Sequence, residues 1–286
     1  MRTIVLLLAC TLGVSAGAAS PTGVWQTTEQ TGAAASSPSG IPEVPALADA
    51  QRLFYDARYD AAAAAALELR AADPEDLAAY ELRTSALLFQ IKSTLANAGD
   101  KDKAFKQCAP CQPVMTAFLG DTAQGQKLAR ARLEADAHDE AALFFLGKLD
   151  LNYVWMQLGT LGRKTGFNEY REARRSLQTV LRRNPRHVRA RVAHAWIEYI
   201  VDTEMPFGTK WLLGGGDRKR ALRTVQEAAA ADTDFFSHAE AIFALWDLQV
   251  RHKTVSAAVG TARMIARDFP DNPEVARFLQ AHAAVP

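Results

Sequence analysis

The sequence has no excess of charge of either sign and few of the residues from which metal sites are built. Lys plus Arg number 33 and Asp plus Glu number 32 in 286 residues, so the formal net charge is +1. Such a balance gives no strongly basic field that would gather nucleic acid or anionic lipid by releasing counterions. With three cysteines and six scattered histidines, a zinc site lacks its ligands. We therefore expect neither a nucleic-acid partner nor a metal.

Recognisable catalytic motifs are also missing. There is no serine nucleophile elbow and no His-Glu-x-x-His zinc motif. Segment 159–166 has the composition of a phosphate-binding loop, but Arg163 stands where a glycine must precede Lys164 and Thr165. Acidic pairs such as Glu75 and Asp76 fall at predicted helix starts, where they interact favourably with the helix dipole. The sequence predicts no catalytic residues, no cofactor and no enzymatic activity.

The first apolar run is typical of an export signal and is too short to cross a bilayer. Arg2 supplies a positive end, residues 4–12 an apolar run, and residues 16–18 a small-residue cleavage site. We predict a signal peptide at 1–19, a flexible leader at 20–42, and a periplasmic protein without a transmembrane segment. The alternative is a lipid-anchored envelope protein, because the residues that end at Cys10 resemble a lipoprotein box.

What the sequence does contain is a repeat. Tyr59, Ala62, Ala66, Leu69 and Pro74 stand at offsets 0, 3, 7, 10 and 15. Offsets 3, 7 and 10 fall on one face of a helix, the small residue at the second position lets a neighbouring helix approach, and the proline ends the helix. The same offsets select Tyr170, Ala173, Leu177, Val180 and Pro185, and again Val255, Ala258, Ala262, Ile265 and Pro270.

Each copy is expected to be the second helix of a pair, and two weaker copies bring the number of pairs to about five. Upstream of each copy lies another amphipathic segment, clearest at Leu146-Gly147, where the glycine permits close packing. A segment that begins at Asn272-Pro273 is expected to cap the end of the stack. We predict an all-α domain over residues 43–283. The markers of the five second helices are Ala62, Gly125, Ala173, Ala221 and Ala258.

This pattern resembles the tetratricopeptide (TPR) family. The resemblance implies a right-handed solenoid of helix pairs whose first helices line a partner-binding groove. Every gap between markers is longer than the family's period of about 34 residues. The alternative is an irregular helical domain. The sets that match the family best are Leu146, Gly147, Ala173 and Pro185, followed by Tyr59, Ala62 and Pro74.

The extra residues form insertions between first and second helices, at about 97–111, 159–168 and 202–216. Stacking brings such loops to one edge, and long loops in compact repeats are often functional. In the third insertion the glycines allow a sharp turn before Asp217, which caps the next helix. This loop is loosely similar to periplasmic TPR partners of substrate-binding transporters. Its predicted rim residues are Phe207, Lys210, Trp211, Gly214, Gly215 and Gly216.

Cys108 and Cys111 lie three residues apart in the first insertion. In an exported protein we expect them to form a disulfide that fixes this insertion at a helix start. Thiol–disulfide exchange is the alternative, because Cys-x-x-Cys motifs at helix starts can be reactive. The βαβ context of redox proteins is missing, which favours the structural disulfide.

The repeat phase places aromatic, cationic and amide side chains on the groove face of the third and fourth pairs. Lys148 and Arg189 are expected to hold a carboxylate, and Asn152 a peptide backbone. The alternative is that aromatic residues at this spacing fill the gaps between repeats. The predicted groove residues are Phe144, Lys148, Asn152, Arg189, Trp196 and Tyr199.

Two functions are compatible with these observations. The first is an exported adaptor or scaffold that binds a protein or peptide partner in the groove. The alternative is a periplasmic solute-binding or small-molecule-binding helical protein associated with a transporter. An open groove with exposed Lys148 and Arg189 favours the first function. A closed apolar pore lined by tryptophans such as Trp155 and Trp196 favours the second.

Overall fold

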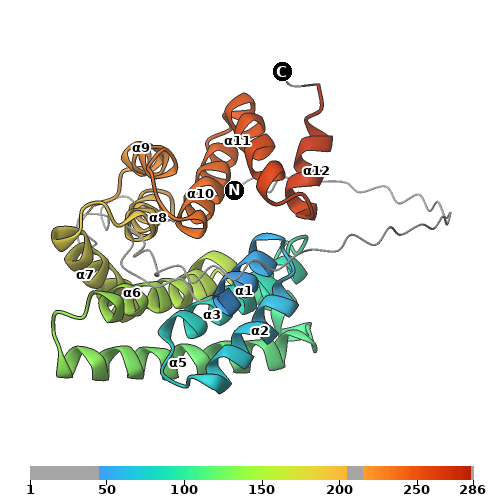
Figure 1. Cartoon of the computed structure of the whole chain (residues 1–286). Helices are drawn as coiled ribbons and strands as arrows, with labels where there is room; N and C mark the ends of the chain where they lie inside the picture. Colours follow the sequence, from blue (N-terminus) through green and yellow to red (C-terminus); the bar gives the residue numbers. More distant parts are fainter. Residues whose placement is uncertain (1–44, 205–214, 285–286) are drawn as a thin grey trace, which may run out of the picture. The chain divides into compact units, whose positions relative to one another are not determined.

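The computed structural model describes residues 45–204 and 215–284, and the regular structure within these ranges is entirely helical (Figure 1). The described residues belong to one unit that spans residues 36–286. The predicted signal peptide and leader, residues 1–42, lie outside the described residues. So do Phe207, Lys210, Trp211 and Gly214 of the third insertion, and the domain boundaries stay predictions.

Ten of the helices in the described chain form five consecutive pairs. Besides these, α4 (Lys101–Gln107) lies in the first insertion, a π-helix (Trp155–Thr160) continues α6, and α12 (Pro273–Ala281) follows the last pair. The predicted all-α solenoid of five helix pairs with a capping helix is confirmed. The pairs are α1 (Pro45–Tyr55) with α2 (Tyr59–Ala72), α3 (Leu77–Thr94) with α5 (Cys111–Ala135), α6 (Glu140–Val154) with α7 (Phe167–Arg183), α8 (Val188–Glu204) with α9 (Arg218–Ala229), and α10 (Phe235–Arg251) with α11 (Val255–Asp268).

Local signals set where many of these helices begin and end. Three second helices, α2, α7 and α11, end two residues before Pro74, Pro185 and Pro270, because the residue before a proline disfavours the helical conformation. At six helix starts, an Asp or Asn side-chain oxygen accepts hydrogen bonds from backbone N–H groups of the first turn. These capping residues are Asp76, Asp100, Asp139, Asp217, Asp234 and Asn272.

The residues that define the repeat form the buried face of the second helices. Small residues at this face bring each second helix close to its neighbours, and the larger ones fill the space that remains. Eleven of them have 0% of their surface exposed, which confirms the periodicity found in the sequence. They are Ala62, Ala66, Ala173, Leu177, Val180, Ala221, Val225, Ala228, Ala258, Ala262 and Ile265.

The first two insertions contain helical residues and contact each other. Arg163 of the second insertion lies 2.6 Å from Asp102 of α4, measured from Nε to Oδ1. Its guanidinium also lies 5.4 Å from the ring centroid of Phe105. Phe105 and Leu161 are both buried in one apolar cluster. These two insertions therefore meet along one edge, as the stacking of repeats predicts.

The third insertion is described only from Gly215 onward, and there it matches the expected turn. Gly215 has a φ of +76°, a conformation that favours glycine. A Cβ on Gly216 would lie 2.5 Å from the backbone nitrogen of Asp202, so no side chain fits. Asp217 then accepts hydrogen bonds from the backbone nitrogens of Lys219 and Arg220, both at 3.0 Å. The turn and the cap are thus a tight entry into α9.

Close approach between α6 and α7 depends on Gly147. A Cβ at this position would lie 2.8 Å from Cγ of Leu177 and 3.4 Å from the backbone oxygen of Ala173. Gly125 is similar in α5, where a Cβ would lie 2.8 Å from Cδ1 of Leu149. By contrast, a Cβ on Gly120 of the same helix meets nothing within 4 Å.

We expect Gly147→Ala to lower the free energy of unfolding by about 1–3 kcal/mol, because the added methyl overfills a packed contact. The matched control is Gly120→Ala, which is expected to raise it by about 0.5–1 kcal/mol, since alanine is the better helix former. Urea denaturation monitored by circular dichroism measures both. A stabilising Gly147→Ala would contradict the close approach of α6 and α7.

Asp150 of α6 is a carboxyl group enclosed by the core. None of its surface is exposed, and its Oδ1 accepts a hydrogen bond of 2.6 Å from Nε2 of Gln126. Burial, and next the negative charge of Glu172, raise the pKa of Asp150 to about 9. Glu172 itself pairs with Arg130. Asp150 is therefore protonated in the folded protein at neutral pH.

Between an ordinary aspartate pKa of about 4 and the folded value, the folded chain holds a proton that the unfolded chain has released, so stability falls as pH rises. Asp150→Asn keeps an acceptor for Gln126 and never ionises. We expect a higher melting temperature than wild type at pH 8 and no difference near pH 4. The exposed Asp232→Asn is the control, and an equal gain at both pH values would contradict the assignment.

Candidate functional site

The first helices of the pairs surround a cavity of about 450 Å³. Almost all of its wall comes from α1, α3, α6 with its π-helix, α8 and α10, and α12 contributes at one side. This is the arrangement that the TPR resemblance implies, in which first helices present the binding surface. Small-molecule sites have volumes of roughly 300–1,000 Å³, so the cavity falls in their range.

The first and last helices of the described chain meet along one side of this cavity. Tyr55 of α1 lies among Phe236, Phe243 and Phe269, whose ring centroids are 6.2, 5.2 and 5.4 Å from its own, respectively. Asn272, the N-cap of α12, donates a hydrogen bond of 2.6 Å from Nδ2 to the backbone oxygen of Tyr55. The groove predicted from the sequence is therefore closed along this side.

Four charged side chains from four first helices form a ring of ion pairs in the cavity wall. Lys148 Nζ lies 2.5 Å from Glu240 Oε1 and 3.4 Å from Glu81 Oε1. Arg189 lies 2.6 Å from Glu240 Oε2 through Nε and 3.1 Å from Glu81 Oε2 through Nη2. We call these residues the ion quartet. Their side chains are only 6–13% exposed, so the quartet closes its part of the cavity.

The quartet pairs two basic side chains with two carboxylates. Burial favours the neutral amine of Lys148, but Glu240 and Glu81 raise its pKa above the ordinary value. Burial likewise opposes the charge of Glu240, yet Lys148 and Arg189 lower its pKa to about 2. The stabilisation is therefore present above the ordinary glutamate pKa and is lost as pH falls towards 2. At neutral pH no charge of the quartet is left to attract a charged ligand.

Aromatic rings form much of the remaining wall. Phe54 and Phe89 meet edge to face at 5.4 Å between centroids, and Trp155 and Trp196 do so at 5.4 Å. Arg251 extends over both indoles, with its guanidinium 5.9 Å from Trp155 and 5.6 Å from Trp196. Large rings with fixed orientations give an apolar ligand extensive contact area. Phe243, Trp246 and Phe278 also line the cavity.

The cavity reaches solvent where α3 and α10 end. Asp247 and Arg251 pair at 2.8 Å between Oδ1 and Nε, and their side chains are 37% and 33% exposed. Lys92 of α3 is exposed and also lines the cavity. Burial opposes the ionisation of Asp247, but the charges of Arg251 and Lys92 lower its pKa. This end therefore presents charged groups at the mouth of the cavity.

Four of the six predicted groove residues line the cavity, namely Lys148, Asn152, Arg189 and Trp196. Two do not, and their predicted placement was wrong. Phe144 is fully buried, and its ring lies 4.7 Å from that of His187 between centroids, at an angle of 32°. Tyr199 is buried in the cluster that joins α8 to α9 and α10. For these two residues, the aromatic side chains at helical spacing pack in the core, which was the alternative interpretation.

The partners of the polar groove residues also differ from the prediction. Lys148 and Arg189 hold carboxylates of the chain itself, Glu81 and Glu240, so neither is available to a partner's carboxylate. Asn152 donates hydrogen bonds of 3.0 Å from Nδ2 to the hydroxyls of Thr84 and Ser85. Contact between the cavity residues and a ligand stays a prediction.

Most residues of the cavity wall were not predicted from the sequence, because the predicted groove residues all belong to α6 and α8. Applied to α10, the same three- and four-residue spacing selects Glu240, Phe243, Asp247 and Arg251, all of which line the cavity. Phe54 and Phe89 carry a weaker signal, since neither belongs to a motif. The pairing of α1 with the last helices has no signal in the sequence at all.

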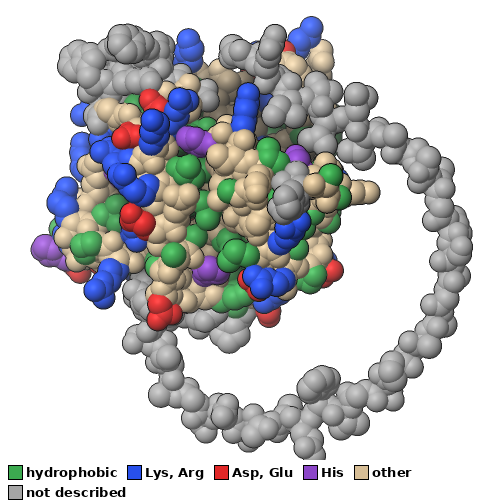
Figure 2. All heavy atoms as spheres, turned by 90° about the horizontal axis from the view of Figure 1, so that it is seen from above, with side chains coloured by type: hydrophobic (Ala, Val, Ile, Leu, Met, Phe, Trp, Pro, Cys, Tyr) green, Lys and Arg blue, Asp and Glu red, His purple; other side chains and the backbone are tan. Residues whose placement is uncertain are grey.

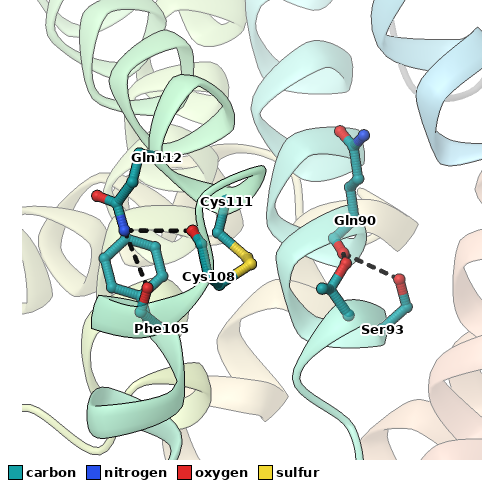
Figure 3. The surroundings of a disulfide bond; sticks show 7 residues. Gln90, Ser93, Phe105, Cys108, Cys111 and Gln112 are labelled. Atoms are coloured by element: carbon teal, nitrogen blue, oxygen red, sulfur yellow. Dashed lines mark hydrogen bonds between the residues drawn. A yellow bond between two sulfur atoms is a disulfide. The ribbon is translucent and has the colours of Figure 1, made fainter.

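Cys108 and Cys111 form a disulfide between the end of α4 and the start of α5, with their Cα atoms 5.3 Å apart (Figure 3). Gln112 Nε2 donates a hydrogen bond of 2.9 Å to the backbone oxygen of Phe105, which fixes the same turn. Cys111 is buried with Phe105 beside α3. The disulfide therefore holds the first insertion against the helix whose other residues line the cavity.

Two kinds of feature are absent from the described ranges. These ranges contain no group of three or more His, Cys, Asp or Glu side chains placed to hold a metal ion. Within the same residues, no helix has both the length and the apolar character needed to cross a membrane.

Removing Glu240 leaves Lys148 and Arg189 to share Glu81 alone, so one buried positive charge is no longer balanced. We expect Glu240→Gln to lower the free energy of unfolding by about 3–5 kcal/mol. The matched control is Glu227→Gln, which breaks a pair with Arg191 in which the glutamate side chain is 58% exposed. Exposed pairs contribute about 0–1 kcal/mol. Urea denaturation at pH 7 compares the two, and equally small losses would show that the quartet contributes little.

Comparison with known proteins adds a likeness in fold. No protein-family model and no curated protein matches the sequence. Among solved structures, the chain is similar to a thermophilic TPR protein of Thermus thermophilus, at 16% sequence identity and a TM-score of 0.47, over 82% of this chain and 96% of that chain. The helical-repeat architecture itself is established by the chain's own five helix pairs.

Proposed function

We propose that this chain is a binding protein, without enzymatic activity, that takes a small and largely apolar ligand into the cavity between its first helices. The observation that carries the proposal is the cavity itself, about 450 Å³ in volume and lined by Phe54, Phe89, Trp155, Trp196 and Trp246 among others. Apolar pockets with a few convergent polar groups are the usual form of small-molecule sites.

The pairing of the two cations supports one of the two functions that the sequence left open. A peptide groove with free Lys148 and Arg189 would attract a carboxylate, but in the ion quartet both are neutralised and only 12% and 11% exposed. A wall in which these charges are paired and several aromatic rings are present instead favours a ligand that has to leave water. The alternative of a solute-binding or small-molecule-binding protein associated with a transporter therefore has the better support.

A protein or peptide partner is the second candidate, and the open end of the cavity favours it. Lys92, Asp247 and Arg251 lie where a second chain could reach them. A partner could insert one bulky side chain among the tryptophans and pair its charges with these groups, as anchor residues do at interfaces. In this version the chain is an adaptor, and the cavity receives one residue of its partner.

Export to the periplasm belongs to the same proposal. The signal peptide is predicted from sequence, and a disulfide between Cys108 and Cys111 suits an oxidising compartment. Lipid anchoring at Cys10 remains the alternative location. In either case the cavity would take its ligand outside the cytoplasm.

The proposal predicts that blocking the cavity abolishes binding of an apolar probe. N-phenyl-1-naphthylamine fluoresces when it enters an apolar site, and we expect saturable binding to the wild-type protein. Val250→Trp places a large ring on the cavity wall and is expected to weaken binding at least tenfold. The matched control is Val255→Trp, because Val255 is 37% exposed and does not line the cavity. Its affinity should equal that of wild type.

Two outcomes count against this function. Equal affinities for Val250→Trp and Val255→Trp would place the probe elsewhere, and no saturable binding to wild type would remove the small-molecule site. A peptide library provides the second arm. The adaptor would be favoured if the probe does not bind and peptides bind wild type and Val255→Trp but not Val250→Trp.

A further inference from the structure

The solvent face of α7 is a stripe of positive charge. Arg171, Arg175, Arg182 and Arg186 are all exposed, and they recur at intervals of four, seven and four residues. This spacing puts them on one side of α7 and of the turn that follows it. The helix has 17 residues, and at about 1.5 Å per residue it is roughly 25 Å long. The opposite side of α7, with Ala173 and the other repeat residues, is in the core.

Cations also gather at the start of α9, where helix formation does not favour them. Arg218, Lys219 and Arg220 occupy its first turn, and the positive end of the helix dipole disfavours cations there. The cap Asp217 offsets part of this repulsion. Arg223 adds a further exposed charge one turn later. The cluster is therefore not explained by the stability of α9.

The two clusters together make one side of the protein strongly basic. Figure 2 shows Lys and Arg side chains gathered towards the left of the view, the side on which Figure 1 has α7 and α9. Nearby anions are used within the fold, since Glu172 pairs with Arg130 and Glu198 with Arg220. We call this surface the basic face. Arg218 and Arg220 are exposed but pair with Asp202 and Glu198. The other exposed cations of the face are Lys164, Arg171, Arg175, Arg182, Arg183, Arg186, Lys219 and Arg223.

The net charge of the whole chain gives no indication of this basic face. A net charge of +1 suggested that no strong field was present, but that value averages over all residues. Exposed charges are screened beyond about 8 Å at physiological salt, so a partner responds to the local excess. The balanced composition of the whole chain therefore does not exclude a local attraction for anionic lipid at α7 and α9.

An exposed aromatic side chain lies at the end of the stripe. Phe167 opens α7 and is 54% exposed, the largest exposure among the large apolar residues of the described chain. The guanidinium of Arg171 lies 5.8 Å from its ring centroid. Aromatic rings beside cations are typical of surfaces that lie in the headgroup region of a bilayer. Phe167 and the cations beside it therefore fit the headgroup region of a bilayer.

We propose that the basic face docks on the surface of a bilayer that contains anionic phospholipid. The cations bind lipid phosphates, and Phe167 enters the headgroup region. Most of these cations are arginines, whose planar fork of donors suits bidentate binding to phosphate. Adsorption is peripheral, because the apolar side of α7 is already in the core. The inference is independent of what the cavity binds.

The test is co-sedimentation of the protein with vesicles of phosphatidylcholine, with and without 30 mol% phosphatidylglycerol. We expect binding to the anionic vesicles only, and at least tenfold weaker binding when NaCl is raised from 50 to 300 mM. The triple variant Arg171→Glu, Arg175→Glu, Arg182→Glu should lose at least 30-fold in affinity. The charge-matched control, Lys103→Glu, Lys127→Glu, Arg267→Glu, changes exposed residues on α4, α5 and α11 and should lose less than threefold.

A second variant separates docking from mere attraction between opposite charges. Phe167→Ser should weaken binding to anionic vesicles three- to tenfold while leaving its salt dependence unchanged. Circular dichroism confirms that each variant is folded. Val250→Trp, which blocks the cavity, should bind vesicles as wild type does, so failure of the cavity proposal and failure of this one are distinguishable.

Three results would overturn the proposal. In the first, the wild-type protein does not co-sediment with anionic vesicles. In the second, both triple variants lose affinity for these vesicles equally. In the third, wild type binds soluble polyglutamate in a way that depends on Arg171, Arg175 and Arg182 but does not bind vesicles. That result would assign the basic face to an acidic protein instead.

Discussion

Close approach between helices is the constraint on which the structure depends. Alanine or glycine occupies the same position on each second helix, and these residues are buried without exposed surface wherever the repeat is strong, as at Ala62, Ala173 and Ala258. A larger side chain at these places would separate the helices and misplace the first helices that follow. The cavity is therefore positioned indirectly, by residues that never touch it.

The ion quartet resolves a conflict that this packing creates. First helices that face a common interior bring Glu81, Lys148, Arg189 and Glu240 together where little water remains. Buried charges are tolerated when each has an opposite partner and good geometry. The quartet meets that condition with two anions and two cations. It thereby fixes the relative register of α3, α6, α8 and α10 without leaving a net charge in the cavity wall.

Much of the fold could be predicted from the sequence, because the determining signals are local. Proline positions, Asp and Asn caps and the burial of small residues at fixed offsets account for the five pairs and the capping helix. The site was predicted only in part. Lys148 and Arg189, predicted on the groove face, line the cavity, but their carboxylate partners belong to other repeats, and those of Arg189 lie 51 and 108 residues away in the chain. No local pattern identifies such partners. Phe144 shows the converse error. It lies one turn before Lys148 on the same face of α6, so the repeat phase alone does not distinguish its buried position from one that lines the cavity.

The contact between the two ends of the described chain changes how the repeats depend on one another. In an open array each repeat touches only its neighbours, so the terminal repeats can unfold alone. Here the hydrogen bond from Asn272 to Tyr55 joins residues 217 positions apart, and Phe236, Phe243 and Phe269 enclose the ring of Tyr55. Neither end can fray without exposing apolar surface on the other. We therefore expect the array to unfold as one cooperative unit, and adding or deleting a repeat would require the contact between α1 and the last helices to open.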